Sequence, residues 1–254
     1  MGKIESKYMS VVTVLNNLKQ VVRMHNGELL PDDYLCVDLE TSGFDRKRDV
    51  ILQYGHCLVE NRQVVERLSV VINWFESDVP AVWLEERIRK TARAMELEGK
   101  AFHLTAEKVR AGVPPVQALP QIMEIIKAYR DSKVMLVMHN GLNFDVEMLQ
   151  SAARTDLGYE LEFGAEDVFD TGVIVKASQI KDYMLTVPLA GETFRDYQVR
   201  INGFRTPGIH WSLNNFCVEF FGLAIDPAGG HDADQDAYAL HLLMEKFREL
   251  TSEN

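Results

Sequence analysis

The sequence has few cysteines, no CxxC pair and no long apolar run. Its three cysteines, Cys36, Cys57 and Cys217, lie far apart in 254 residues, which argues against a disulfide framework or a zinc ribbon. No stretch free of charged residues is long enough to span a bilayer, and the N-terminal residues contain no apolar signal-peptide core. We therefore expect a soluble, intracellular, cytoplasmic protein that makes no contact with membranes.

Positive charge is also scarce. Lys and Arg number 27 against 38 Asp and Glu, which gives a formal net charge of −11. A protein that coats nucleic acid through a polybasic surface has the opposite balance. The apolar content of 46% is ordinary for a globular protein, and the length suffices for a single large core. The composition therefore excludes a histone-like binder and indicates a folded domain.

The spacing of apolar residues predicts an α/β fold. Strands are expected over 33–40, 50–60 and 63–74, and the short Asn61-Arg62 turn makes them an antiparallel meander. Two shorter strands, separated by helices, are expected over 134–138 and 167–169. The remaining predicted helices cover 81–98, 116–130, 143–154, the segment ending at 178, 211–221 and 232–250. The sum is a mixed five-stranded sheet, three antiparallel strands followed by parallel strands, flanked by helices.

Two regions stand apart from this core. Residues 1–30 are expected to form a helical extension to a domain over 31–254, because residues 5–24 carry apolar positions at helical spacing, namely Met9, Val12, Leu15, Leu18 and Val22. This helix is either a brace or a docking element. The second region, about 180–210, is predicted to be a hairpin insertion, because the Asn202-Gly203 pair is typical of a type I′ turn.

The hairpin region and one predicted helix are rich in basic side chains. In the insertion these alternate with aromatic side chains: Tyr183, Phe194, Arg195, Tyr197, Arg200, Phe204, Arg205 and Trp211. Such a composition suits a channel for a single strand, and the alternative is that the aromatic rings pack on the sheet edge. A second basic strip lies on the helix over 81–98, at Arg87, Lys90 and Arg93.

Two carboxylates end the first predicted strand. The segment VDLETSG places Asp38 and Glu40 on one face and its apolar residues on the other, because strand side chains alternate. Two carboxylates beside an apolar strand repel each other and resist burial. A divalent cation between them removes both penalties, and oxygen ligands suit Mg²⁺ or Mn²⁺. The pair indicates a metal site, the alternative being a solvated strand end.

Two further carboxylates lie near predicted helix starts. Asp145 falls in the first turn of its helix, where the helix dipole favours an anion, although alone it has the alternative of a capping acid without a further role. Asp236 falls on the inward, apolar stripe of the last helix, and a carboxylate on a buried face requires a partner. Asp232 and Asp234 point away from that stripe and are expected to be solvated.

Together these motifs resemble the DEDDh exonucleases, the DnaQ-like branch of the ribonuclease-H-like fold. The resemblance is carried by Asp38 and Glu40 in VDLETSG, Asp145 in HNGLNFDVEML, and His231 with Asp236 in HDADQDA. It covers about residues 33–250. The histidine of the third motif distinguishes this branch from its tyrosine-bearing sister. The segment FHLT followed by GVP is similar to the family's stretch between its first two motifs.

The resemblance implies a metal-dependent 3′→5′ exonuclease that releases nucleoside 5′-monophosphates from single-stranded or frayed DNA 3′ ends. It implies two Mg²⁺ or Mn²⁺ ions held by four carboxylates, with His231 as the general base that takes a proton from the attacking water. The expected metal ligands are Asp38, Glu40, Asp145 and Asp236. The expected substrate contacts are Thr41, Gly43, Phe44, His103 and Asn143. Phe44 has the alternative of a plain core residue, and Asn143 is also expected to cap a helix.

Other functions stay open at this point. An exoribonuclease that trims RNA 3′ ends, like an oligoribonuclease, has the same residues, because ribose preference depends on the shape of the pocket. A proofreading subunit of a DNA polymerase is a second alternative. Asp236 lies close to the C-terminus, so we expect any polymerase contact, or a homodimer, to involve residues 1–30. A non-catalytic scaffold is disfavoured because all five reactive residues are present.

Overall fold

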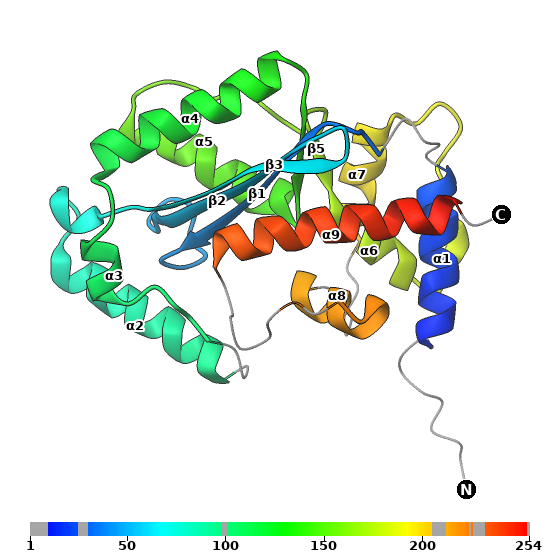
Figure 1. Ribbon diagram of the computed structural model, residues 1–254, viewed down its shortest axis with the longest axis horizontal. Coiled ribbons are helices and arrows are strands. Elements are labelled where there is room, and N and C mark those ends of the chain that lie inside the picture. The colour runs from blue at the N-terminus through cyan, green and yellow to red at the C-terminus, as the bar shows by residue number, and fades with distance from the viewer. Residues whose placement is uncertain are drawn as a thin grey trace, which may run out of the picture.

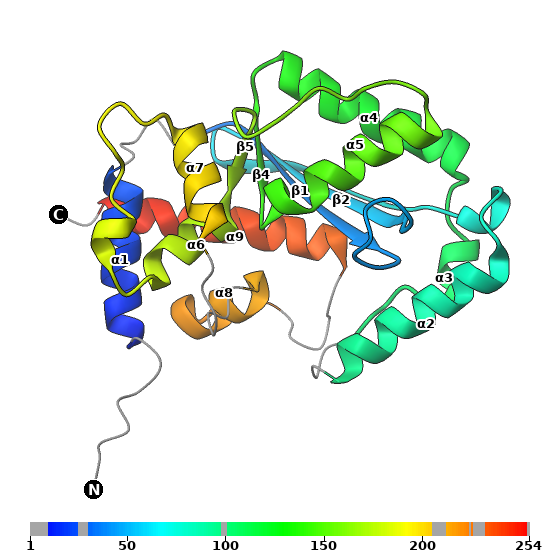
Figure 2. The same cartoon turned by 180° about the vertical axis from the view of Figure 1, so that it is seen from behind.

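A five-stranded mixed sheet forms the centre of the molecule (Figures 1 and 2). The computed structural model describes residues 10–24, 30–97, 101–204, 212–223, 225 and 232–252. The strand order is β3-β2-β1-β4-β5. The strands are β1 (Tyr34–Thr41), β2 (Ile51–Glu60), β3 (Gln63–Val71), β4 (Met135–Met138) and β5 (Val168–Asp170). The first three pair antiparallel and β4 and β5 run parallel to β1, which confirms the predicted fold class.

Helices cover both faces of the sheet (Figure 1). The helices on one face are α4 (Pro115–Asp131) and α5 (Asp145–Asp156). The opposite face carries α1 (Val11–Met24), α6 (Thr171–Gln179), α8 (Leu213–Phe221) and α9 (Ala233–Ser252). At one end of the molecule lie α2 (Ala81–Leu97) and α3 (Ala106–Arg110), and α7 (Phe194–Gly203) lies near β5. Short 3₁₀ turns are η2 (Trp74–Glu76), η3 (Gly141–Asn143) and η4 (Tyr183–Leu185).

Strand β1 separates the two apolar cores. Leu35, Val37 and Leu39 pack with the α4–α5 side, whereas Tyr34 and Cys36 pack with the α9 side. This alternation fixes the face on which every later residue of β1 must lie. Since Asp38 and Glu40 follow Cys36 at even spacing, their side chains emerge on the face that α9 covers.

The first helix belongs to the core of the domain. Helix α1 lies against α6 and α9, and its Leu18 and Val21 are fully buried in the same apolar cluster as Phe247. The predicted set of apolar positions on this helix is partly wrong, because the Val12 side chain is 68% exposed while that of Val14 is buried. Met9 lies outside the described residues. The described part of this helix therefore packs as a brace of the domain, and the docking role stays a prediction.

The predicted hairpin near residue 200 is wrong. Residues 194–203 form α7, which begins at the cap residue Thr193, whose hydroxyl accepts a hydrogen bond from the backbone N–H of Asp196. Buried Tyr197 and Ile201 are four residues apart, which is helical rather than strand spacing. The Asn-Gly pair lies in the last turn of this helix, which Phe204 follows as the cap residue, instead of forming a hairpin turn. Arg205 and Trp211 lie outside the described residues.

Three further features of the described residues are the turn between β2 and β3, the cysteines and the apolar character of the helices. The Asn61-Arg62 turn is confirmed, with positive φ angles of 48° and 67° at its two residues. All three cysteines are free and buried. Among the described helices, none combines the length and the apolar character that crossing a bilayer requires.

Candidate active site

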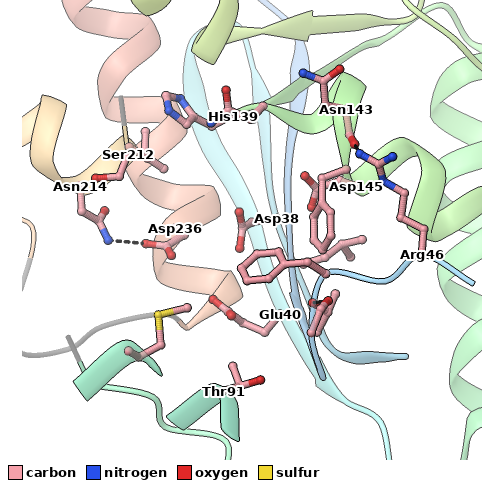
Figure 3. Close-up of a pocket in the computed structure, with 18 residues that line it drawn as sticks. Asp38, Glu40, Arg46, Thr91, His139, Asn143, Asp145, Ser212, Asn214 and Asp236 are labelled. Carbon is pink, nitrogen blue, oxygen red and sulfur yellow. Dashed lines mark hydrogen bonds between the residues drawn. The ribbon is translucent and has the colours of Figure 1, made fainter. Parts of the chain in front are cut away.

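Four carboxylates from three elements meet at the carboxyl end of β1 (Figure 3). Asp38 and Glu40 come from β1, Asp145 opens α5 and Asp236 lies in the first turn of α9. One oxygen each of Asp38, Glu40 and Asp236 lie within 4.8 Å of one another. Glu40, Asp145 and Asp236 are buried, at 5–7% exposure. The structure thus brings together all four residues predicted as metal ligands.

The four acids strongly disfavour one another's ionised forms. Burial raises the pKa of Asp38 well above its usual range, and the neighbouring carboxylates of Asp236, Asp145 and Glu40 raise it further. Burial also raises the pKa of Asp145 to about 7, with the Asp170 carboxylate adding to the effect. Such a cluster is stable in ionised form only beside compensating positive charge.

Asp145 is held beside β1 by backbone contacts. Its carboxylate accepts hydrogen bonds from its own N–H and from the N–H of Leu39, both of which lower its pKa and partly oppose the effect of burial. Leu39 lies between the two acids of the β1 motif, so this contact fixes Asp145 against them. As predicted, Asp145 lies in the first turn of its helix, where it is the first residue. The cap position is taken by Phe144 without a side-chain bond, so the prediction that Asn143 caps this helix is wrong.

Asp236 is placed by the close seating of α9 on β2. Gly55 lies directly under the start of α9, where an added Cβ would stand 2.1 Å from the carbonyl carbon of Ala233. Only glycine allows this approach. The Asp236 carboxylate then accepts a hydrogen bond of 3.0 Å from the side-chain amide of Asn214 in α8, which Figure 3 shows as a dashed line.

The other two acids of the HDADQDA motif are not simply solvated. Asp234 forms a two-pronged ion pair with Arg67 of β3, at 2.6 and 3.0 Å. Asp232 accepts a hydrogen bond of 3.1 Å from Gln53 of β2 and lies 3.8 Å from the ammonium group of Lys108. These contacts tie the start of α9 to the sheet, so the two acids help to seat the helix that carries Asp236.

A cavity of about 470 Å³ opens beside the four acids. Thr41, Gly43, Phe44 and Asn143, all predicted substrate contacts, line it. The Phe44 ring is 79% exposed and its centroid lies 5.8 Å from that of Phe144. The core interpretation of Phe44 is therefore wrong, and an aromatic pair stands at the rim of the cavity.

The loop that carries Gly43 and Phe44 is anchored to α2. Arg87 binds both carboxylate oxygens of buried Asp49, and Asp49 also accepts from the Ser42 hydroxyl at 2.9 Å. A Cβ at position 43 would collide with the Arg87 guanidinium, so a larger residue there would have to displace this ion pair. Arg87 is thus structural. Since Lys90 pairs with Glu86, two of the three cations in the predicted basic strip are already neutralised.

Two predicted site residues are not part of this described cluster. His103 is exposed in the segment before α3 and is not among the described residues that line the cavity. His231, the predicted general base, lies outside the described residues. In the predicted aromatic-basic channel, Tyr197 is buried and Arg200 pairs with Glu192 at 2.6 Å, so for this part the packing alternative holds.

Sequence reasoning missed several residues of the site. Arg46, Thr91, His139, Asn140, Ser212 and Asn214 also line the cavity, and buried Asp170 lies behind it. A signal for Asp170 was available, because it directly follows the last predicted parallel strand. The carboxyl ends of parallel strands meet at one edge of a sheet and commonly form the binding site there. The signals for Asn214 and Ser212 were weak, since neither belongs to a motif.

The donor set fits a hard divalent cation. Carboxylate oxygens are the ligands that Mg²⁺ and Mn²⁺ prefer, and three of them converge within 4.8 Å. The pKa of Asp38 is raised by burial and by the neighbouring carboxylates, and a cation bound among these side chains would neutralise their charges. Asp38, Glu40 and Asp236 are therefore suited to hold one divalent ion.

Comparisons with known proteins support the fold at low sequence identity. No protein-family model matches the chain, and no curated protein matches it in sequence. The structure is similar to E. coli Exonuclease I bound to a dT13 oligonucleotide, with a TM-score of 0.55 at 17% identity over 86% of this chain. A second Exonuclease I structure gives 0.56 at 18% identity over 87%. The fold is ribonuclease-H-like.

The matched structures are much longer than this chain. The chain spans 41% and 42% of those two Exonuclease I chains. It also spans 42% of the Exonuclease I chain in a complex named ExoI/SSB-Ct, with a TM-score of 0.55 at 17% identity over 87% of its own length. The likeness confirms the predicted ribonuclease-H-like fold, with its mixed sheet flanked by helices.

Proposed function

We propose that the protein is a metal-dependent 3′→5′ exonuclease of the DEDDh type that shortens single-stranded nucleic acid. The observation that carries the proposal is the convergence of Asp38, Glu40, Asp145 and Asp236 beside one cavity. Four acids in such a place are costly without cations, and phosphodiester cleavage is the chemistry that paired divalent ions serve. The structural likeness to Exonuclease I bound to a dT13 oligonucleotide supports the same function.

Each acid has a defined role in the proposed mechanism. Figure 3 shows Asp38 between Asp236 and Asp145, so Asp38 would contribute to both of two ion positions. Glu40 and Asp236 would complete the first and Asp145 would hold the second. Bound there, two Mg²⁺ or Mn²⁺ ions would supply Lewis-acid stabilisation and activation of the attacking water. His231 would accept the proton from that water, because imidazole titrates in the required range.

The cavity rim supplies contacts for a strand end. The exposed Phe44 ring, which lies beside half-buried Phe144, presents an aromatic face on which a base would stack, a contact that tolerates any base. The backbone at Gly43 and the Thr41 side chain lie beside the acids and would meet the terminal nucleotide. A cavity of about 470 Å³ is in the usual range for a small-molecule site. The expected product is a nucleoside 5′-monophosphate.

A 3′-end assay tests the proposal directly. The substrates are 5′-labelled single-stranded DNA, duplex DNA and single-stranded RNA, each with Mg²⁺ or Mn²⁺. We expect a ladder of shortened single strands that chelator abolishes, and faster cleavage of DNA than of RNA. Faster cleavage of RNA would assign the protein to the exoribonucleases. Binding without cleavage in Mn²⁺ would contradict the enzyme and favour the scaffold, with Asp38→Asn as the matched inactive control.

A further inference from the structure

The β5 edge of the sheet is bound by one side chain, that of Gln198. Strand β5 is an edge strand, and its outward backbone groups need partners. Gln198 of α7, fully buried, supplies them. Its carbonyl oxygen accepts from the N–H of Asp170 at 2.8 Å, and its amide donates to the carbonyl oxygens of Val168 at 2.8 Å and Ala165 at 3.1 Å. Helix α7 thus fixes the position of Asp170.

The Asp170 carboxylate in turn binds the loop that precedes Asp145. One oxygen accepts from the backbone N–H of Asn140 at 2.8 Å and from that of Gly172 at 2.9 Å. The other oxygen accepts from the N–H of Leu142 at 3.1 Å. Only the Gly172 bond belongs to the ordinary capping of α6. The other two bonds cross to a different segment of the chain.

The loop itself has little freedom to settle elsewhere. Asn140 adopts a left-handed conformation with φ of 60°. An added Cβ on Gly172 would stand 2.8 Å from the backbone nitrogen of Asn140. A second link to α7 runs from the Asn143 side-chain amide to the side-chain oxygen Oδ1 of Asn202, at 2.9 Å. Two residues after Asn143 the chain reaches Asp145, so the loop sets where that carboxylate lies.

We propose that Asp170 and Gln198 are positioning residues for Asp145, linking α7 through β5 to the loop over 139–144. This inference rests on the proposed function in one respect only, namely that Asp145 holds a divalent ion. Residues outside the ligand set that fix a ligand commonly change metal affinity by about 10–100-fold. Neither residue touches substrate or the reacting atoms.

The competing explanation is that Asp170 serves only to cap α6. Asparagine caps a helix as well as aspartate does, but in Asp170→Asn an NH₂ group replaces one of the two acceptor oxygens. This NH₂ group has no lone pair with which to accept a hydrogen bond, so one backbone N–H of the loop is left buried without an acceptor. Gln198→Met removes all three bonds of Gln198 and keeps its bulk. Ile201→Val on the same helix is the matched control, because buried Ile201 packs without polar links.

The experiment uses the full chain and two readouts. Hydrogen exchange followed by mass spectrometry reports protection of the backbone amides over 139–145, and electron paramagnetic resonance of free Mn²⁺ reports ion binding. We expect the backbone amides of this loop to exchange faster in Asp170→Asn and in Gln198→Met than in the wild type. Both variants should bind Mn²⁺ about 10–100-fold more weakly. Asp145→Asn should lose Mn²⁺ affinity as well. Ile201→Val should match the wild type in both readouts.

The outcomes separate the two proposals. Unchanged loop protection, or faster exchange with unchanged Mn²⁺ affinity, would overturn the positioning role and leave Asp170 as a helix cap. A wild type that binds Mn²⁺ but never shortens DNA or RNA would contradict the exonuclease and leave the positioning result intact. If the wild type binds no Mn²⁺, the metal site itself is wrong, and so is the positioning of a metal ligand.

Discussion

Asp236 and Asp145 approach Asp38 from opposite sides, and they are held there by different forces. Asp236 lies on a long helix whose inner face is buried against the sheet, with Gly55 allowing the helix to seat closely. Asp145 follows a short loop whose backbone is held by the buried carboxylate of Asp170. Asp236 is placed mainly by the packing of its helix, with polar contacts at the helix start. Asp145 is placed mainly by hydrogen bonds to the loop that precedes it. The two sides should therefore respond differently to mutation and to pH.

The largest effect is expected at Asp38, because it serves both sides. Asp38→Asn removes a charge that both proposed ion positions would share, and a divalent ion contributes several kcal/mol to such a transition state. At 1.36 kcal/mol for each factor of ten, this amounts to a loss of about 10³-fold or more in kcat. Gel-based turnover of labelled single-stranded DNA measures it. Comparable activity in Asp38→Asn would contradict the assignment of the site.

Gly55→Ala should disrupt the packing of α9 on β2, which places Asp236. The added Cβ would meet the backbone of Ala233 and Asp234 at 2.1–2.4 Å, and because backbone cannot step aside as a side chain can, α9 must move. We expect a loss of about 1–3 kcal/mol in the free energy of unfolding, measured by urea titration, together with a fall in kcat. Gly203→Ala, where nothing lies within 4 Å of the added Cβ, is the control and should fold normally.

Asn214→Ala tests whether packing alone holds Asp236. The Asn214 amide gives Asp236 a hydrogen bond of 3.0 Å, and its loss should lower kcat at most about 10-fold, the lower end for an outer partner of a metal ligand. Because the helix still seats Asp236, the loss should be smaller than that in Asp170→Asn. Equal losses of apparent kcat in the two variants, compared at one subsaturating Mn²⁺ concentration, would erase the distinction between the two sides.

Phe44→Ala should affect substrate binding without affecting the fold. Its ring is 79% exposed, so the melting temperature should stay within the error of calorimetry. Stacking on a base contributes about 1–3 kcal/mol, and the variant should raise KM while kcat changes little. A melting temperature several degrees lower would instead restore the core interpretation of Phe44.

The sequence predicted the packed side well and the hydrogen-bonded side poorly, for a physical reason. The inward stripe of α9 repeats at helical spacing, so the buried position of Asp236 could be deduced from its own helix. The contacts of Asp170 with Asn140 and Leu142 join segments almost 30 residues apart, and no local pattern encodes them. The prediction for residues 194–203 failed for a different reason, because it followed the Asn-Gly pair and not the helical spacing of buried Tyr197 and Ile201.

The last prediction concerns pH and applies chiefly to the hydrogen-bonded side. In the fold the pKa of Asp145 is raised to about 7 and that of Asp170 to about 6, from the usual 3.8, mainly by burial. Carboxyls with raised pKa values hold a proton in the folded state that the unfolded chain has already released. Their contribution to stability is full below about pH 4 and is lost as pH rises through 6 to 7.

Metal-free protein should therefore melt at a lower temperature at pH 8 than at pH 5, by roughly 2–4 °C for each kcal/mol involved. Mg²⁺ binds the ionised acids of the folded state, so it should raise the melting temperature more at pH 8 than at pH 5. Calorimetry at the two pH values, with chelator or with Mg²⁺, measures both trends. In Asp145→Asn the fall in melting temperature from pH 5 to pH 8 should be smaller, because one of the titrating groups is gone. An equal fall in this variant would show that the stability difference arises elsewhere in the molecule, and that the loop side of the site is no more sensitive to pH than the packed side.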